Sequence, residues 1–192
     1  RAQLAHRCFA ALGADRGGGA SGGSMLEPRR KVAFTGGGGG GACLNGVPLG
    51  VSWAAQLVDA MLVTGFPYNI HDRVEEIVGL FAAFVGQVRA VRRLGSAAID
   101  LCYVAAGRLD GFWETDLKAW DMSAGALIVE EAGGRVTATA GDPLTSRGGH
   151  VLATNGPLPG AMLDGTATCR QGRAPRRPSG RPPGAARAGR PR

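Results

Sequence analysis

The chain has 192 residues, 44% of them hydrophobic, which is enough to bury one core of ordinary size. Its net charge of +7 depends on eight arginines in residues 168–192, where no acid occurs, so the rest of the chain carries −1. A folded surface that binds nucleic acid is therefore not expected, and no apolar run is long enough to cross a membrane. The four cysteines form no CxxC pair, which disfavours a disulfide framework or a zinc site and is typical of an intracellular protein.

Composition divides the chain into three parts. Residues 1–30 pass from a short helical pattern into a glycine-rich segment, which predicts a flexible leader or remnant. Residues 31–166 have the patterns of a folded domain, and residues 167–192, rich in Arg, Pro and Gly, are expected to be disordered. Because the chain begins with Arg1, we expect a fragment or a processed product. A residual transit peptide is the alternative for the leader, so the expected location is the cytoplasm or a plastid.

The first half of the predicted domain consists of strands followed by one helix. A strand over 31–35 precedes six glycines, which lack the Lys-Ser/Thr sequel of a phosphate-binding P-loop. Asn45-Gly46 predicts a tight hairpin between 42–44 and 47–49. A buried strand lies within 57–64, and apolar residues at three- and four-residue steps predict an amphipathic helix over 72–88.

The second half alternates short strands and helices rich in small residues. Strands are predicted at 89–94, 112–114, 135–139 and 150–155. One helix is expected to open at 95–98 and continue over 99–109, a second to follow Asp121 as far as Glu131, and a last one to start in 159–163. No role is assigned to the three histidines.

Polar groups stand at the start of both central helices. Gly95, Ser96 and Ala97 open the first, Asp121 opens the second, and Glu114 lies between them after two aromatic residues. A helix N-terminus offers free backbone N–H groups and partial positive charge, which suit a phosphate or a metal-bound carboxylate. This arrangement predicts a phosphate and metal site.

The segment Trp120–Gly125, followed by an apolar run and Glu131-Ala132-Gly133-Gly134, resembles the C-terminal signature of the inositol monophosphatase family. The hairpin at 41–46 and the Gly-Phe-Pro-Tyr of 65–68 are also similar to that family. The resemblance covers roughly residues 31–163, the second half of the family's domain. It implies an α/β fold, a layered α/β/α/β/α sandwich of which only the C-terminal half is present.

The resemblance also implies a magnesium-dependent phosphomonoesterase that hydrolyses inositol monophosphate with metal-activated water. It implies that Asp121 is a magnesium (Mg2+) ligand, that Glu114 accepts hydrogen bonds from inositol hydroxyls, and that Gly95, Ser96 and Ala97 contact the substrate. It further implies a homodimer. Without the resemblance, Asp121 would be a helix cap, Glu114 an exposed strand-end acid, and the Gly-Ser-Ala segment a site of close packing.

Nearby cations have simpler expected roles. Lys118 is expected to be solvated, and Arg92 and Arg93 to pair with surface acids or a neighbouring subunit.

One departure from the family pattern affects the expected activity. The family's other metal ligands belong to a Glu-Glu pair and a D-P-(I/L)-D-G-T motif upstream, and residues 1–30 contain neither. We interpret the partial matches at 141–145 and 163–166 as coincidence. Since one carboxylate is too few for a pair of magnesium ions, no catalytic residue is assigned and this chain is expected to be impaired.

Three alternatives stay open from the sequence. In the first alternative, the substrate is another phosphomonoester, such as histidinol phosphate or a sugar bisphosphate, although Glu114 and the Gly-Ser-Ala segment favour inositol. Alternatively, the chain is a non-catalytic, truncated relative that acts by binding a partner. The Arg-rich tail as a nucleic-acid arm is disfavoured because it lacks interleaved aromatic residues.

Overall fold

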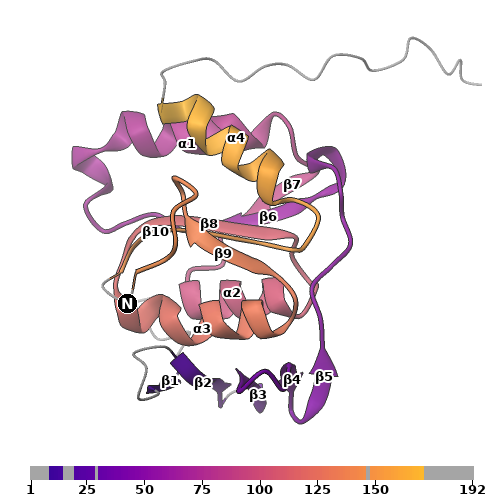
Figure 1. Cartoon of the computed structure of the whole chain (residues 1–192). Helices are drawn as coiled ribbons and strands as arrows, with labels where there is room; N and C mark the ends of the chain where they lie inside the picture. The colour runs from indigo at the N-terminus through magenta and orange to yellow at the C-terminus, as the bar shows by residue number, and fades with distance from the viewer. Residues whose placement is uncertain (1–8, 15–19, 29, 146–147, 171–192) are drawn as a thin grey trace, which may run out of the picture.

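The computed structural model describes residues 9–14, 20–28, 30–145 and 148–170. Four layers follow one another through the molecule (Figure 1): a helix pair, a five-stranded sheet, a second helix pair and a second five-stranded sheet. The outer pair is α1 (Val74–Val85) with α4 (Pro159–Arg170), and the inner pair is α2 (Ala97–Ala105) with α3 (Ala119–Glu131). The expected α/β layered architecture is confirmed, and the described residues form four of its layers.

The sheet between the helix pairs is mixed. Its order is β7 (Ala90–Arg92), β6 (Met61–Thr64), β8 (Gly111–Leu117), β10 (Gly149–Thr154) and β9 (Arg135–Ala138). Strand β6 pairs in parallel with β7 and β8, whereas β10 is antiparallel to both of its neighbours. The three parallel strands therefore end at the same edge of the sheet, which is the edge where ligands bind in open α/β sheets.

The second sheet is antiparallel and runs in chain order. It contains β1 (Phe9–Ala14), β2 (Ala20–Glu27), β3 (Val32–Gly37), β4 (Ala42–Leu44) and β5 (Val47–Leu49). The predicted Asn45-Gly46 hairpin is confirmed: the two residues have φ of 50° and 80°, the positive values that this tight turn requires.

Part of the expected leader is a strand pair. The helical pattern predicted before residue 23 is wrong where the structure describes it, because Phe9–Ala14 is β1 and pairs with β2. Strand β2 pairs along its length with β3, and the side chain of Met25 is 1% exposed. Pairing with the next strand in the chain and burial of one methionine therefore order a glycine-rich segment that has no periodicity of its own. Residues 1–8 and 15–19 lie outside the described residues.

The main core lies around α2 and α3, between the two sheets. Its buried side chains come from both helices and from both sheets, including Phe34, Leu101, Phe112, Ile128 and Val151. The two helices approach closely, since a Cβ at Gly125 would lie 2.7 Å from the Leu101 Cβ. Small residues in both helices allow this contact, which fixes the two helix starts relative to one another.

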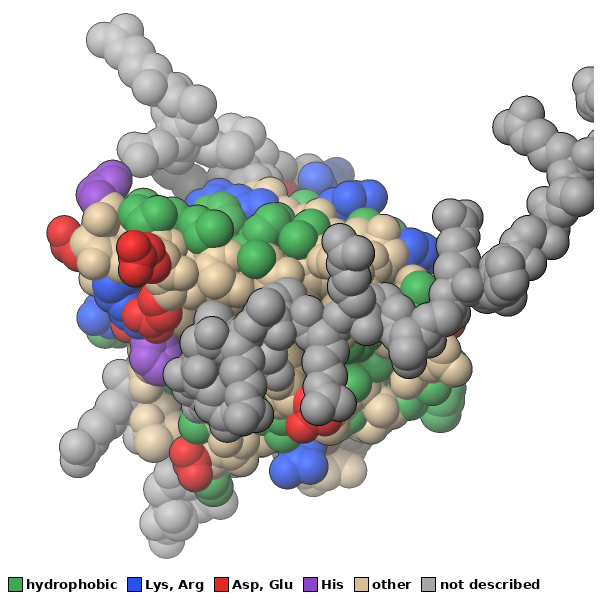
Figure 2. Space-filling model, turned by 90° about the horizontal axis from the view of Figure 1, so that it is seen from above, with side chains coloured by type: hydrophobic (Ala, Val, Ile, Leu, Met, Phe, Trp, Pro, Cys, Tyr) green, Lys and Arg blue, Asp and Glu red, His purple; other side chains and the backbone are tan. Residues whose placement is uncertain are grey.

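Helix α1 covers the other face of the mixed sheet. Its buried face includes Ile77, Leu80 and Phe84, whereas Val74, Val78 and Val85 are about half exposed. Figure 2, which looks onto the α1–α4 layer, shows hydrophobic side chains gathered on this surface.

Two helix boundaries differ from the prediction. Helix α3 begins at Ala119, so Asp121 is its third residue and does not precede it. Helix α4 extends to Arg170 and includes the residues 163–166, where the Thr166 hydroxyl donates to the carbonyls of Leu163 and Thr139. The partial motif at 163–166 is thus part of a packed helix.

The glycine loop 36–41 is held by helix α3. The backbone N–H groups of Gly39 and Gly41 donate to the two carboxylate oxygens of Glu131, at 3.0 and 2.9 Å. These two N–H groups are therefore occupied by a carboxylate of the protein itself. Across the described part of the chain, every helix is too short or too polar to span a membrane.

Candidate functional site

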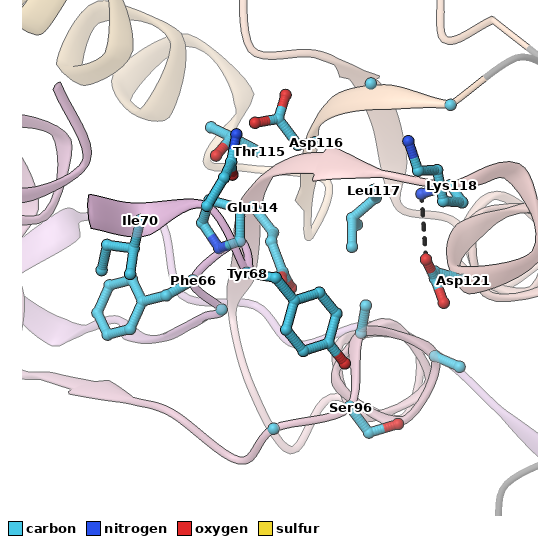
Figure 3. Close-up of a pocket in the computed structure, with 18 of the residues that line it drawn as sticks. Phe66, Tyr68, Ile70, Ser96, Glu114, Thr115, Asp116, Leu117, Lys118 and Asp121 are labelled. Atoms are coloured by element: carbon cyan, nitrogen blue, oxygen red, sulfur yellow. Dashed lines mark hydrogen bonds between the residues drawn. The ribbon is translucent and has the colours of Figure 1, made fainter. Parts of the chain in front are cut away.

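A cleft of about 1520 Å³ lies at the edge where the three parallel strands end (Figure 3). Its walls are the loop after β6, the loop from β7 into α2, the last residues of β8 and the start of α3. The five residues predicted for the site, Gly95, Ser96, Ala97, Glu114 and Asp121, all line it. The fold thus brings together groups that are up to 26 positions apart in the chain.

Glu114 lies on the cleft floor against Gly65. A Cβ at Gly65 would overlap the Glu114 carboxylate, so only glycine leaves room for the side chain as it stands. Among the described residues, no hydrogen bond or ion pair involves this carboxylate. Burial raises the pKa of Glu114 to about 7, while Arg93 lowers it and Asp121 raises it further. The floor therefore presents a carboxyl group that is free to accept a ligand's hydrogen bonds.

A second acid, Asp100, is buried behind Glu114. Its side chain is 0% exposed, and neither carboxylate oxygen has a hydrogen-bond partner among the described residues. Burial raises the pKa of Asp100 to about 7, the charge of Glu114 contributes to the rise, and Arg93 opposes it. The charges of Glu114, Asp100, Asp121 and Arg93 act on one another, and these four residues together are called "the floor".

The start of α2 forms one side of the cleft. Ser96 directly precedes the helix, and its side chain makes no capping hydrogen bond. Arg93 also lines the cleft: its Nη1 lies 2.6 Å from the position that a Cβ at Gly95 would take. The expectation that Arg93 serves surface acids or another subunit does not describe this position, because the acids it faces are Glu114 and Asp100.

Asp121 lies at the start of α3, across the cleft from Ser96 (Figure 3). One of its oxygens, Oδ2, accepts the backbone N–H of Lys118 at 3.1 Å and so caps the helix. The capping role that the sequence offers as an alternative is therefore present, and the residue still lines the cleft. Lys118 lines the cleft as well and is exposed, and no ion pair among the described residues involves it.

The described residues do not form a complete metal site. Nowhere in the described ranges do three or more His, Cys, Asp or Glu side chains converge as metal ligands would. Asp121 has the carboxylate chemistry that a hard divalent cation prefers, and it lines the cleft.

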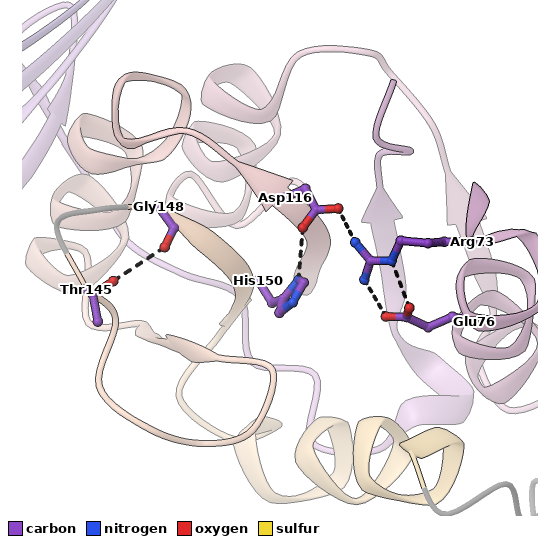
Figure 4. Close-up of polar contacts among 6 residues, drawn as sticks. All are labelled: Arg73, Glu76, Asp116, Thr145, Gly148 and His150. Atoms are coloured by element: carbon purple, nitrogen blue, oxygen red, sulfur yellow. Dashed lines mark hydrogen bonds and ion pairs between the residues drawn. The ribbon is translucent and has the colours of Figure 1, made fainter. Parts of the chain in front are cut away.

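The outer rim of the cleft carries a second charged group, "the rim", formed by Arg73, Glu76, Asp116 and His150 (Figure 4). Arg73 donates to both Glu76 oxygens, at 2.9 and 2.6 Å, and to Asp116 Oδ2. His150 Nδ1 lies 3.9 Å from Asp116 Oδ1. The hydrogen bond to Glu76 raises the pKa of Arg73, and the same bond lowers the pKa of Glu76. The rim charges are therefore largely satisfied by one another.

The sequence did not predict the cleft residues Arg73 and Asp116, the role of Arg93 on the floor, or the acid Asp100 buried beneath the cleft. Two had local signals. Asp100 is a lone acid in an apolar helix, one turn after Ser96, and its N–H donates to the Ser96 carbonyl at 2.9 Å. Asp116 follows Glu114 by two positions in one strand. Arg73 had no local signal, because its partner Asp116 is 43 positions away.

Comparisons with known proteins agree with this geometry. The sequence profile of the inositol monophosphatase family matches residues 10–172, a range that includes most of β1 and all of β2. The Nus factor SuhB of Pseudomonas aeruginosa is 47% identical over 116 residues, which cover 59% of this chain and 43% of that protein. The inositol-1-monophosphatase of Synechocystis sp. is 47% identical over 117 residues, covering 61% of this chain and 41% of that protein.

A solved structure shows the same arrangement. Inositol monophosphatase from Anabaena (Nostoc) superimposes with a TM-score of 0.73 and 38% identity, over 80% of this chain and 60% of that one. The chain spans less than half the length of the Pseudomonas and Synechocystis relatives named above. With the profile match extending over most of its residues, the chain belongs to the inositol monophosphatase family.

Proposed function

We propose that the cleft binds the phosphomonoester of a polyhydroxylated alcohol, with inositol monophosphate as the substrate. The observation that carries this proposal is the pairing of a free carboxylate with two helix starts in one cleft. Glu114 is uncommitted, and the starts of α2 and α3 line the same cleft. A carboxylate accepts hydrogen bonds from hydroxyl groups, whereas helix N-termini attract phosphate.

Each group has a distinct part in the proposed complex. The ester phosphate is held at the starts of α2 and α3, where Ser96 adds a free hydroxyl and Arg93 and Lys118 add positive charge. The alcohol lies over the floor with its hydroxyls donating to Glu114. Because Gly65 has no Cβ, the Glu114 carboxylate can occupy this position on the floor.

Hydrolysis is the proposed activity, and magnesium the proposed cofactor. Two observations support this: relatives named inositol-1-monophosphatase are among the matches, and the carboxylate-bearing residue Asp121 lines the cleft. A bound magnesium ion would polarise the phosphate and activate a water molecule as the nucleophile. The described residues supply one ligand, so hydrolysis needs further carboxylates. A homodimer and a cytoplasmic or plastid location stay predictions.

Partner binding without catalysis is the second candidate function. It is favoured by the incomplete ligand set, since no group of three potential ligands converges within the described residues. Ligand binding and phosphate release separate the two candidates.

The test compares inositol 1-phosphate, inositol and inorganic phosphate as ligands in calorimetric titrations with magnesium, followed by a phosphate-release assay. We expect inositol 1-phosphate to bind more tightly than either part. Release by the wild type and by Asp59→Asn, an exposed acid outside the cleft, but not by Asp121→Asn, supports hydrolysis. Binding without release in all three supports the second candidate, and absence of binding refutes the proposed site.

A further inference from the structure

The rim lies where the part of a substrate remote from its phosphate would emerge from the cleft. Arg73 and Asp116 both line the cleft, on the side of the loop that follows β6. Arg73 directly precedes α1, Asp116 lies in β8, and His150 lies in β10, so three elements meet here. Their mutual contacts determine the charge that a ligand meets at this end of the cleft.

Asp116 owes its position to an unusual backbone conformation. Its φ of 61° lies in the left-handed region, which side chains other than those of glycine, asparagine and aspartate rarely adopt. The pairing of β8 with β10 also shifts register here, between Gly149 and Val151. Both irregularities turn the Asp116 carboxylate toward Arg73 and His150 (Figure 4).

The rim has more negative than positive charge. Two carboxylates, Glu76 and Asp116, contact one guanidinium, Arg73, so the group carries −1 with histidine counted as neutral. The cations at the inner end differ, because no ion pair among the described residues involves Arg93 or Lys118. A phosphate is therefore attracted to the inner end, whereas at the rim the one described arginine, Arg73, is already paired with two carboxylates.

We propose that Asp116 is a specificity-determining residue that, by occupying Arg73, restricts the cleft to esters with a single phosphate on an otherwise uncharged polyol. A second phosphate at the rim faces two carboxylates and a guanidinium that both already contact. An uncharged hydroxyl group at the same place meets no such repulsion. The inference rests on the proposed function and selects, among its substrates, monophosphates over bisphosphates.

Two substitutions change the rim charge in steps while keeping its shape. Asp116→Asn retains a side chain that tolerates a positive φ and brings the rim to zero. Adding Glu76→Gln leaves Arg73 without either carboxylate and brings the rim to +1. Coulomb's law in a water-like medium gives roughly a fivefold gain in bisphosphate affinity per step for a phosphate about 7 Å away. Affinity for the monophosphate is expected to change by less than about twofold.

The experiment measures dissociation constants of inositol 1-phosphate and inositol 1,4-bisphosphate for the wild type, Asp116→Asn and Asp116→Asn/Glu76→Gln. Asp59→Asn is the charge-matched control. Binding is followed by calorimetry and by the fluorescence of Trp120, which lines the cleft and is 75% exposed. The expected result is a stepwise rise in the preference for the bisphosphate. Adding Arg73→Gln to the double variant returns the rim charge to zero and should lower the preference to that of Asp116→Asn, and high salt should reduce every step.

The outcomes separate the two proposals. If all variants bind the monophosphate and the preference does not change, Asp116 does not set the substrate class and the inference is overturned. If the wild type binds neither compound, the proposed function itself fails, and the inference with it. A gain in the double variant that is undiminished by Arg73→Gln also overturns the inference, because the freed guanidinium then contributes nothing to it.

Discussion

The floor and the rim of the cleft contain the same kinds of side chains in opposite circumstances. On the floor, Asp100 is fully buried with both oxygens unpaired, and Glu114 has no hydrogen-bond partner among the described residues. At the rim, Arg73 is held by two carboxylates in a partly exposed network. Burial without partners raises the pKa of Asp100 and of Glu114 to about 7, whereas pairing lowers the pKa of Glu76 at the rim.

The difference separates two uses of charge. Buried, unpaired carboxyl groups cost stability, and they are found where a ligand will satisfy them. Exposed, paired charges contribute little stability and mainly fix the electrostatic environment. Floor substitutions should therefore alter binding and the dependence of stability on pH, whereas rim substitutions should alter selectivity.

The largest effect is expected for Glu114→Gln. Loss of the charged acceptor should weaken inositol 1-phosphate binding by roughly 100-fold, about 3 kcal/mol, because hydrogen bonds to charged groups are the strong ones. Inorganic phosphate, which has no alcohol to contact Glu114, should bind as before. Calorimetry on this variant and on Glu75→Gln, an exposed acid on α1, tests both statements. Equal losses for the two ligands would show that Glu114 does not read the hydroxyls.

Asp100→Asn should stabilise the protein, and only at neutral and higher pH. The folded state keeps Asp100 protonated up to a pKa of about 7, while the unfolded chain ionises near 3.8. Because the folded state then binds more protons, wild-type stability falls as pH rises from about 4 to 7 and levels off above. Asparagine cannot ionise and avoids this loss.

The expected gain in the free energy of unfolding is about 2 kcal/mol at pH 8 and near zero at pH 4. Denaturant unfolding of the wild type, Asp100→Asn and Asp59→Asn across this range measures it. Parallel stability curves for the wild type and Asp100→Asn would mean that burial of Asp100 is not what couples folding to pH.

Gly65→Ala should sharpen the comparison by moving a floor group without changing its charge. The new Cβ would overlap the Glu114 carboxylate, which must shift. We expect roughly a tenfold loss of affinity for inositol 1-phosphate and a loss of about 1 kcal/mol in stability, from crowding in a packed site. Gly86→Ala, where a Cβ meets nothing within 4 Å, is the matched control. Unaltered binding by Gly65→Ala would argue against a fixed position for Glu114.

The smallest effect on stability is expected at the rim. Arg73→Gln removes two partly exposed ion pairs and should lower the free energy of unfolding by only about 0.5 kcal/mol, because solvent screens such pairs. Arg89→Gln, an exposed arginine outside the cleft, controls for loss of a charge. A loss as large as those expected on the floor would erase the contrast between the two regions.

Local sequence predicted the elements whose signals are local. The signals for the Asn45-Gly46 turn and for helix α1 each lie within one short segment. The family signature around Asp121 then pointed to Glu114 and Gly95–Ala97 as site residues. Strands β1 and β2 were missed because pairing between strands, β1 with β2 and β2 with β3, stabilises them, and their own composition gives no strand signal.

The rim was missed for the same reason as the strands. Arg73 and Asp116 come together only when α1 and β8 pack on one sheet, and the φ of Asp116 is not readable from a strand-like segment. Asp100 looked like one polar residue in an apolar helix, and its importance depends on how completely the surrounding layers bury it. Contacts between distant residues therefore decided what local patterns did not.

The most direct test of the proposed site is the magnesium dependence of inositol 1-phosphate binding, measured by calorimetry. We expect magnesium to tighten binding to the wild type and to Asp59→Asn, and to have no effect on Asp121→Asn, because Asp121 is the proposed metal ligand at the cleft. Binding that is the same with and without magnesium in the wild type, or a magnesium response that survives in Asp121→Asn, would contradict the assignment.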